Sequence, residues 1–377
     1  MSKALSLRNW RKMKAAVSFR LRRTIIVGEA LLIEARQLIT VGPQTVSATA
    51  TTRFIAPRHI RAQISRAEDN RRNGMRAVRI HQYGGPETLR YEDDVPDPAI
   101  GPDTVLIGSV ATSVNPIDWK LRSGTRQKDF PLRLPAILGR DVSGTVLTVG
   151  SEVRTFKPGD RVIAMADATY AQLVAVPEAV VAHLPDGVDP VDAAAIPLVS
   201  LTGDQLVRIA TRAAAGQTIL VSGALGSVGR AAVHTAKKLG ATVIVGVRAR
   251  QLADAESLGA HSTVALDDDD ALARLDAVDG VADTVGGDIA AKLIGKVRVG
   301  GRFGYASVVP EDAARGASVE MSRVFAQPDP SKLRAFADDV RDGSFVLPIS
   351  RYMPLRDAGL AHELLEKGGG GKIVLTM

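Results

Sequence analysis

Cysteine is absent from the 377 residues of this chain. Its absence excludes disulfide bonds, thiolate catalysis and every metal site ligated by cysteine, and it fits a reducing, cytoplasmic location. Long apolar runs are absent too, so no membrane-spanning helix is expected, because such a helix needs about 18 or more uninterrupted apolar residues. The nearest approach, residues 24–35, is interrupted by Glu29 and Glu34.

Acidic residues are scarce at the start of the chain. Residues 1–74 contain 15 Lys and Arg against 4 Asp and Glu, a net charge of +11, although the whole chain carries only +7. Residues 75–377 hold 33 basic and 37 acidic side chains, a net charge of −4. The basic character therefore belongs to an N-terminal extension, and the main body gives no electrostatic reason to expect a nucleic-acid partner.

Three interpretations of the basic N-terminal extension, residues 1–74, stay open at this stage. Its Arg, Lys and Ser content before the first acid, Glu29, is typical of a targeting segment. The same composition suits a basic arm that binds nucleic acid or a membrane surface. The third interpretation is that the native protein starts at Met75, so that the extension is disordered or not native. The absence of a sustained apolar period and the change of composition at Met75 favour this third interpretation.

Two different patterns follow each other from Met75 onward. Up to about residue 185, short apolar stretches alternate with Gly, Pro and Asp turns, which predicts β structure. Strand-like and helix-like segments then alternate, which predicts βαβ units and a doubly wound parallel sheet. We therefore predict an α/β protein in which a β-rich domain, residues 75–197 and 328–377, is split around a Rossmann domain, residues 198–327.

The stretch ILVSGALGSVGRAAVHTAKKLG, residues 219–240, joins a strand-like segment to a helical one through a glycine-rich turn. Measured against the dinucleotide fingerprint G-x-G-x-x-G, it reads Ala224-x-Gly226-x-x-Gly229. Glycine at these places lets the backbone approach a pyrophosphate and lets helix and strand pack closely, and the helix start attracts negative charge. A tight strand–helix turn without a ligand is the alternative. The predicted dinucleotide contacts are Gly223, Ala224, Gly226, Ser227, Val228 and Gly229.

The next strand-like segment selects the dinucleotide. An NAD site expects Asp or Glu about 20 residues after the glycine turn, where it binds the ribose hydroxyls. TVIVGVRARQ, residues 242–251, contains no acid and presents Arg248 and Arg250 instead. Because a guanidinium group suits a phosphate, the sequence predicts NADP(H) rather than NAD. The alternative is that the two arginines face solvent.

Ordered motifs extend over nearly all of residues 75–377. They read SVNPIDWKLRSG at 113–124, LPAILGRDVSGTV at 134–146, KPGDRV at 157–162, PLVSLTGDQLV at 197–207 and GGKIVLTM at 370–377. In this order they resemble the zinc-independent, quinone-oxidoreductase-like branch of the medium-chain dehydrogenase/reductase superfamily. The resemblance implies a GroES-like catalytic domain split around the Rossmann domain, a homodimer and an NADPH-dependent oxidoreductase of small molecules.

Zinc-dependent members of that superfamily bind catalytic zinc with Cys, the His of a Gly-His-Glu motif and a further Cys or His. The corresponding place here reads Gly139-Arg140-Asp141, and the six histidines of the chain show no spacing typical of a ligand set. We therefore expect no metal site, and no Lewis acid to polarise an alcohol.

The resemblance also implies roles for single residues. Asn115 and Asp118 of the N-P-x-D motif would be the catalytic residues, although Asp118 could equally be a structural turn residue. Thr202 would lie near the nicotinamide ribose and phosphates. The other expected cofactor contacts lie after later Rossmann strands and in the returning C-terminal segment: Asp283, Thr284, Val285, Ala306, Ser307 and Lys372.

The expected reaction is hydride transfer from NADPH to a quinone or another conjugated carbonyl compound. Related enoyl-thioester reductases carry a proton-donating tyrosine shortly after the N-P-x-D motif, whereas residues 122–131 contain none, and Tyr170 is a candidate substitute. A quinone takes its proton from water, so orientation of donor and acceptor can carry most of the catalysis. Trp119, Phe130 and the intervening arginines would border the acceptor; a plain surface role is the alternative. An enone or enoyl-thioester reductase and a non-catalytic NADPH-binding protein remain alternatives.

Overall fold

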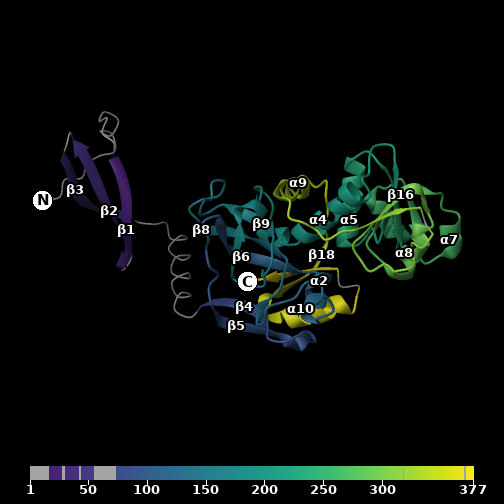
Figure 1. The fold of residues 1–377 in the computed structure, drawn as a ribbon, viewed down its shortest axis with the longest axis horizontal. Helices are drawn as coiled ribbons and strands as arrows, with labels where there is room; N and C mark the ends of the chain where they lie inside the picture. Colours follow the sequence, from purple (N-terminus) through teal and green to yellow (C-terminus); the bar gives the residue numbers. More distant parts are fainter. Residues whose placement is uncertain (1–16, 28–29, 42–43, 55–73, 317, 369–370) are drawn as a thin grey trace. The chain divides into compact units, whose positions relative to one another are not determined.

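The computed structural model describes residues 17–27, 30–41, 44–54, 74–316, 318–368 and 371–377, which fall into two units, residues 1–73 and 74–377 (Figure 1). The described residues of the first unit form an antiparallel sheet in the order β1 (Val17–Val27), β2 (Ala30–Val41) and β3 (Gln44–Phe54). The sequence did not predict these strands. The rest of the basic N-terminal extension lies outside the described residues.

The β-rich part of the second unit contains a seven-stranded sheet whose main path runs β11-β9-β8-β6-β19-β18, with β10 paired to β6. Its strands are β6 (Thr104–Val114), β8 (Asp141–Val149), β9 (Arg161–Met165), β10 (Leu173–Pro177), β11 (Val181–His183), β18 (Ile349–Pro354) and β19 (Lys372–Thr376). A smaller sheet has the order β5 (Leu89–Val95), β4 (Met75–Ile80) and β7 (Ala136–Ile137).

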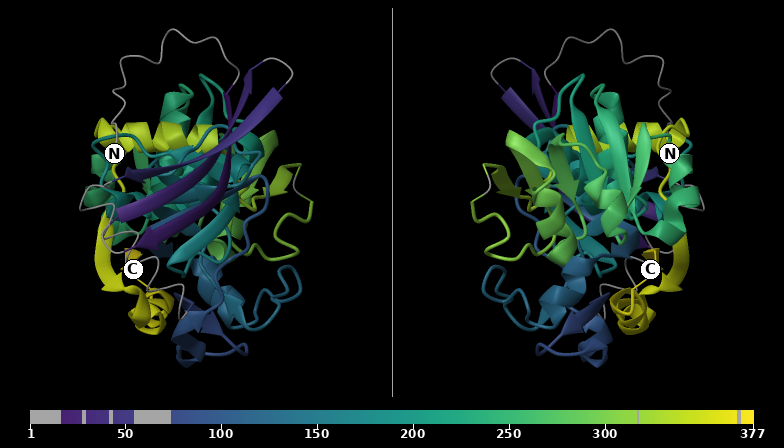
Figure 2. Two further views of the ribbon diagram at one scale, coloured as in Figure 1. Left: turned by 90° about the vertical axis from the view of Figure 1, so that its left-hand side faces the viewer. Right: turned by 90° about the vertical axis from the view of Figure 1, so that its right-hand side faces the viewer.

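The C-terminal segment returns to the first β-rich segment, as the sequence predicts. β19 pairs antiparallel with β6, so that Ile373 lies opposite Val114, and β18 pairs parallel with β19. Figure 2 shows a yellow helix of the C-terminal segment at the lower end of the unit, next to the blue first elements. The β-rich part of the fold is therefore assembled from two segments far apart in the sequence.

The nucleotide-binding part is a sheet of six parallel strands in the order β14-β13-β12-β15-β16-β17. In chain order its strands are β12 (Thr218–Ser222), β13 (Thr242–Val247), β14 (Ser262–Ala265), β15 (Val278–Asp283), β16 (Val297–Tyr305) and β17 (Glu320–Arg323). Numbered from β12, the order is 3-2-1-4-5-6, that of doubly wound dinucleotide-binding sheets. The direction of winding reverses between β12 and β15, and such sheets bind ligands at the carboxyl ends of the strands there. The predicted α/β fold class is confirmed.

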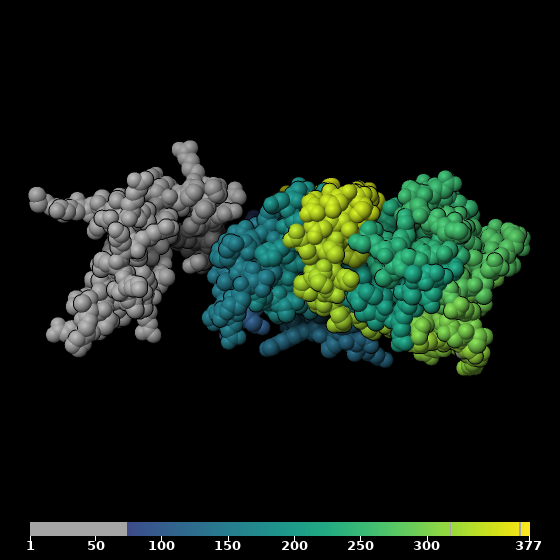
Figure 3. All heavy atoms as spheres, turned by 90° about the horizontal axis from the view of Figure 1, so that it is seen from above, coloured from purple at the N-terminus to yellow at the C-terminus, as the bar shows by residue number. Residues whose placement is uncertain are grey.

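Helices cover the faces of this sheet and link it to the β-rich part (Figure 1). Those that connect its strands include α5 (Ser227–Lys238), α6 (Leu252–Ala255), α7 (Asp269–Ala273) and α8 (Gly287–Ile294). Those at the junction are α3 (Pro190–Ala193), α4 (Pro197–Gln205) with a following π-helical turn (Leu206–Ala210), and α9 (Pro330–Arg341). Figure 3 shows yellow C-terminal residues between the blue-teal and green parts of one face.

Two helices that the sequence did not predict carry polar residues of the site. α2 (Pro116–Arg122) begins at the N-P-x-D motif: Asn115 is its N-cap, and Asp118 accepts a hydrogen bond from the Asn115 N–H. α10 (Ala358–Glu366) buries His362 between the two β-rich segments. Among the described residues, no helix is long and apolar enough to cross a membrane.

Candidate active site

The glycine-rich turn between β12 and α5 has the geometry of an anion-binding turn. Gly223 has φ +62°, a left-handed conformation that favours glycine. A Cβ atom on Gly229 would lie 2.2 Å from the Gly223 carbonyl oxygen and 2.7 Å from the Cα atom of Ala224, so only glycine lets α5 pack this closely. Gly226 is the N-cap of α5 and provides no side-chain cap. The N–H groups of the first helical turn, which includes Ser227 and Val228, are therefore available to an anion.

The glycine-rich turn meets the end of β15 at the reversal point of the sheet. The Ser222 hydroxyl donates to Asp283 Oδ1 over 2.5 Å and accepts from the Thr284 N–H over 2.9 Å, while the Thr284 hydroxyl donates to the Ser222 carbonyl oxygen over 2.7 Å. Asp283 is fully buried and also accepts from the Gly286 N–H, and burial raises its pKa. Asp283 therefore holds this turn together. Ser222 was missed by sequence reasoning, although its place directly before the glycine-rich turn is a usable signal.

The predicted residues after β16 lie beside the same turn. The Ala306 N–H donates to the Asp283 carbonyl oxygen over 3.0 Å. Ser307 lies so close to Gly286 that a Cβ atom there would be 2.7 Å from the serine oxygen. The Val285 side chain is 43% exposed, so it remains accessible to a ligand. These three residues and the glycine-rich turn thus converge on one edge of the sheet.

Thr202 lies on α4, which crosses the start of α5. A Cβ atom on its neighbour Gly203 would lie 2.6 Å from the Val228 carbonyl oxygen, so the two helices are in close contact. The Thr202 hydroxyl donates to the Leu198 carbonyl oxygen over 2.6 Å, and the residue is only 9% exposed. The structure therefore places Thr202 near the N-terminus of α5, directly after the glycine-rich turn.

Arg248 and Arg250 follow β13, the neighbour of β12 in the sheet. Both are exposed, and Arg250 lies in the turn η5 (Ala249–Gln251). Neither forms an ion pair within the part of the chain that the structure describes. Asp267 accepts a hydrogen bond from the Ala249 N–H over 2.7 Å and so fixes the segment that presents both guanidinium groups.

A second group of polar side chains lies in the β-rich part, around the buried Asp141. Its carboxylate accepts hydrogen bonds from the Ser113 hydroxyl, from Asn115 Nδ2 over 2.7 Å and from the Leu198 N–H over 2.7 Å. Lys372 Nζ donates to Asn115 Oδ1 over 2.7 Å and lies 3.4 Å from Asp141 Oδ2. Lys372, expected among the cofactor contacts, thus lies with Asn115 and Asp141. Burial lowers its pKa, and the charge of Asp141 opposes that shift. Sequence analysis noted Asp141 only as part of the segment that replaces the Gly-His-Glu motif, and assigned it no role in the site.

A buried chain of hydrogen bonds, Asp118–Tyr170–His362–Arg122, joins α2 to α10. Tyr170 donates to Asp118 Oδ2 over 3.2 Å, His362 Nε2 lies 3.0 Å from the tyrosine oxygen, and Arg122 lies 3.2 Å from His362 Nδ1. Arg122 also forms an ion pair with Glu366. Because arginine only donates, His362 Nδ1 must accept and Nε2 must carry the proton. Burial and the Arg122 charge lower the pKa of His362 to about 3, so the ring stays neutral.

Asp118 is the member of this chain whose carboxylate is only partly satisfied by hydrogen bonds. It is fully buried, and its Oδ1 atom has no hydrogen-bond partner among the described residues. Burial is the main cause that raises its pKa from 3.8 to about 7. Tyr170 is also fully buried, and burial and the neighbouring Asp118 raise its pKa. The predicted turn role of Asp118 is therefore present in the structure, while a catalytic role stays a prediction.

The raised pKa of Asp118 predicts a pH dependence of stability. Between about pH 4 and pH 7 the folded protein keeps a proton on Asp118 that the unfolded protein has released, so this contribution to stability is lost as the pH rises through 7. The variant Asp118→Asn has no carboxyl group at this position and therefore lacks this pH-dependent contribution. Urea unfolding at pH 5 and pH 8 should show that wild-type stability, relative to the variant, falls by about 2–3 kcal/mol between these pH values.

Comparison with the variant removes the contribution of His362. The lowered pKa of His362 changes stability in the opposite direction, because its contribution to stability is lost as the pH falls from 6.5 towards 3. This contribution is the same in the wild type and in Asp118→Asn, so it cancels. An equal change in the two proteins would show that Asp118 is ionised at every pH tested.

The Gly139-Arg140-Asp141 segment does not fit a zinc ion. Arg140 forms an ion pair with Asp167, and the Asp141 carboxylate is already bound to the four donors named above. The described residues contain no group of three His, Cys, Asp or Glu side chains that could hold a metal ion. The reaction proposed below therefore uses no metal step.

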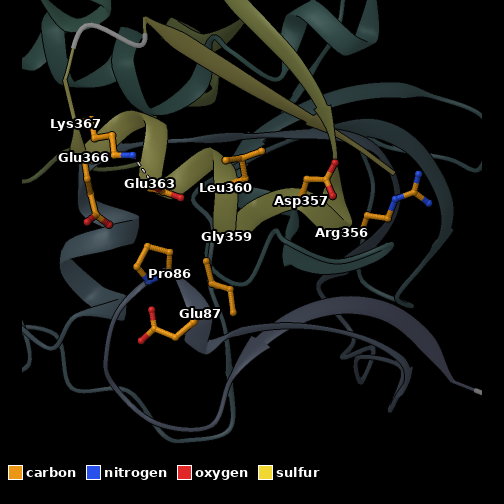
Figure 4. A pocket seen from close by; sticks show the side chains of 10 residues that line it. Pro86, Glu87, Arg356, Asp357, Gly359, Leu360, Glu363, Glu366 and Lys367 are labelled. Carbon is orange, nitrogen blue, oxygen red and sulfur yellow. Dashed lines mark hydrogen bonds and ion pairs between the residues drawn. The ribbon is translucent and has the colours of Figure 1, made fainter.

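A pocket of about 800 Å³ lies between the turn η2 (Pro86–Thr88) and α10 (Figure 4). It contains none of the predicted cofactor or catalytic residues within the described chain, so we do not place the active site there. It does contain Glu366, which links it to the buried chain through Arg122. The lining residues are Pro86, Glu87, Leu89, Arg356, Asp357, Gly359, Leu360, Glu363, Glu366 and Lys367.

Comparisons with known proteins agree with this architecture. Residues 101–186 match the family model of the alcohol dehydrogenase GroES-like domain, and residues 258–375 match that of the zinc-binding dehydrogenases. The β-rich sheet built from two segments and the doubly wound sheet are those of the medium-chain dehydrogenase/reductase superfamily. The chain is 33% identical to a quinone oxidoreductase of Pseudomonas aeruginosa over 324 residues, which are 79% of this chain and 98% of that protein. The chain belongs to the quinone-oxidoreductase-like branch of the superfamily.

Solved structures show the same relationship. The quinone oxidoreductase from Coxiella burnetii superimposes with a TM-score of 0.72 at 30% identity and covers 80% of this chain and 99% of its own. The Escherichia coli quinone oxidoreductase complexed with NADPH superimposes with a TM-score of 0.70 at 26% identity, covering 80% of this chain and all of that chain (100%). The CurK enoyl reductase, at 19% identity and a TM-score of 0.72, shares the fold.

Proposed function

We propose that this chain is an NADPH-dependent oxidoreductase that passes hydride to a quinone or another conjugated carbonyl acceptor. The observation that carries the proposal is the uncapped start of α5 at the reversal point of the sheet, with two exposed arginines that form no ion pair in the described chain. The NADPH-bound quinone oxidoreductase among the structural neighbours supports the choice of cofactor.

The residues of the glycine-rich turn would receive the pyrophosphate, and Arg248 and Arg250 would bind the 2′-phosphate. When bound, NADPH supplies the hydride from its nicotinamide ring. The residues that we expect to line the nicotinamide half are Thr202, Thr284, Val285, Ala306 and Ser307, whereas Asp283, expected among the cofactor contacts, is fully buried and would support their turn from within. Asn115 is 1% exposed, and its amide is bound on both sides, so we expect it to act by fixing the wall of the site. The catalytic assignment of Asn115 and Asp118 and the cofactor assignment of Lys372 remain predictions.

The described residues around the site do not fit a metal, and the one phenol considered as an acid, Tyr170, is buried and bound to Asp118. A quinone suits such a site, because its reduced oxygens take protons from water and the protein has only to orient donor and acceptor. A homodimer and a cytoplasmic location remain proposals drawn from the family resemblance and the lack of cysteine.

NADPH oxidation with a panel of quinones and enones tests the function. We expect turnover with 1,4-naphthoquinone and a clear preference for NADPH over NADH. Turnover with enones alone would identify an enone reductase. NADPH binding without turnover across the panel would identify a non-catalytic NADPH-binding protein.

A further inference from the structure

Positive charges and aromatic rings gather where the loop after α2 meets the end of β17. We call this group the cation–aromatic cluster; it consists of Lys120, Arg126, Phe130, Arg323 and Phe325. The Arg126 guanidinium lies 5.8 Å from the ring of Phe130 and 5.6 Å from that of Phe325, and Arg323 lies 4.7 Å from Phe325. The two phenylalanine rings meet edge to face at 5.5 Å. Residues from two segments about 200 positions apart in the sequence thus form one surface.

The cation–aromatic cluster has more positive side chains than acidic partners. Asp129 pairs with Arg126 over 2.7 Å, whereas Lys120 and Arg323 form no ion pair within the described ranges of the chain. Burial, followed by the charges of Arg126 and Arg323, lowers the pKa of Lys120. Cations held this close repel one another, and an anion between them would offset that cost.

The cluster lies next to the proposed site. Asn115 is the N-cap of α2, and β17 ends at the same sheet edge as the glycine-rich turn, with Arg323 beside Tyr305 at the end of β16. The Val324 N–H donates to the Tyr305 carbonyl oxygen over 2.8 Å, and Gln205 of α4 donates to the Gln327 carbonyl oxygen over 2.7 Å.

The cluster is too far from Arg248 and Arg250 to share a phosphate with them. Those arginines follow β13, and four steps across the sheet separate β13 from β17. At about 4.8 Å per strand this is about 19 Å. The anion that the cluster would bind is therefore not the one proposed for the two arginines.

We propose that the acceptor of this enzyme is a flat conjugated molecule with an anionic substituent, which the cation–aromatic cluster binds. The two phenylalanine rings offer an apolar surface to the flat body, and Lys120 and Arg323 face the anionic group. This inference rests on the proposed function, because it assigns the acceptor class of that reaction.

A matched pair of acceptors tests it: 1,4-naphthoquinone and 1,4-naphthoquinone-2-sulfonate, each at saturating NADPH. In Arg323→Gln and in Lys120→Gln, kcat/KM for the sulfonate should fall about ten-fold, as expected for the loss of one charge-assisted hydrogen bond. The value for the neutral quinone and the KM for NADPH should change less than about two-fold. Each variant is compared with the wild type on the same acceptor, so the different reactivity of the two quinones cancels.

Lys128→Gln is the control. Lys128 is exposed and lies in the loop after α2, between Arg126 and Phe130, but it does not belong to the cluster. Equal losses on both quinones, or the same sulfonate loss in Lys128→Gln, would overturn the inference and leave the proposed function standing. If the wild type reduces neither quinone, the two acceptors cannot be compared by kinetics, and if it reduces no enone of the panel either, the proposed function fails. In that case, calorimetric titration of the protein with naphthalene-2-sulfonate and with neutral 2-naphthol measures acceptor binding directly and tests the inference without a reaction. Sulfonate binding that is lost in Arg323→Gln supports an anion site, and equal or absent binding overturns it.

Discussion

Replacing Asp141 with asparagine should lower the free energy of unfolding by about 3–5 kcal/mol, the usual cost of leaving one partner of a buried ion pair alone. Asp141 is fully buried and Lys372 is 3% exposed, so water cannot take over the missing charge. In either orientation the amide of the new side chain would also place its NH2 group against a donor, either Asn115 Nδ2 or the Leu198 N–H. Urea unfolding followed by circular dichroism measures the loss.

The opposite substitution, Lys372→Met, should cost less, about 1–2 kcal/mol, because Asp141 keeps three hydrogen bonds from Ser113, Asn115 and Leu198. In the double variant Asp141→Asn/Lys372→Met the two costs should not add, and the coupling should be about 2 kcal/mol. Strict additivity, or a larger cost for Lys372→Met than for Asp141→Asn, would show that the lysine and not the carboxylate organises the group.

Removing both Arg248 and Arg250 should raise the KM for NADPH about 100-fold and leave the KM for NADH within about two-fold, because NADH has no 2′-phosphate to lose contact with. Both side chains are exposed, so the double alanine variant should fold like the wild type. Steady-state kinetics with each cofactor and 1,4-naphthoquinone measures the preference.

Arg274→Ala is the matched control for the cofactor experiment, since it removes an exposed arginine at the end of α7 and should change neither KM. An NADPH preference that survives in the double variant would show that the phosphate is bound elsewhere on the protein. A loss of affinity for both cofactors alike would assign the arginines to the adenosine or pyrophosphate.

The sequence predicts those parts of the fold and site that depend on short-range patterns. The glycine-rich turn follows from residues within one strand, one turn and one helix, and the alternation after residue 198 predicts the parallel sheet. Contacts between distant residues leave no such pattern. Lys372 reaches Asn115 across 257 positions, and Tyr170 reaches His362 across 192.

The helices α2 and α10 were missed for a different reason. α2 has only seven residues, too few for an apolar period, and its signal is the capping pair Asn115 and Asp118. α10 has a small buried face of Ala358, Ala361 and His362. The histidine there reads as polar in the sequence, although it is fully buried in the structure.

The position of β19 has a consequence for how the protein forms. β19 lies in the interior of the seven-stranded sheet, between β6 and β18, yet it follows the whole nucleotide-binding part in the sequence. During synthesis on the ribosome, the six-stranded sheet can therefore fold while the part of β6 that β19 later covers, Ala111–Val114, still has an unpaired edge. That edge is a site for mispairing between nascent chains until β19 emerges. We expect the nucleotide-binding part to fold first, and Lys372, the first residue of β19, to take its buried position last.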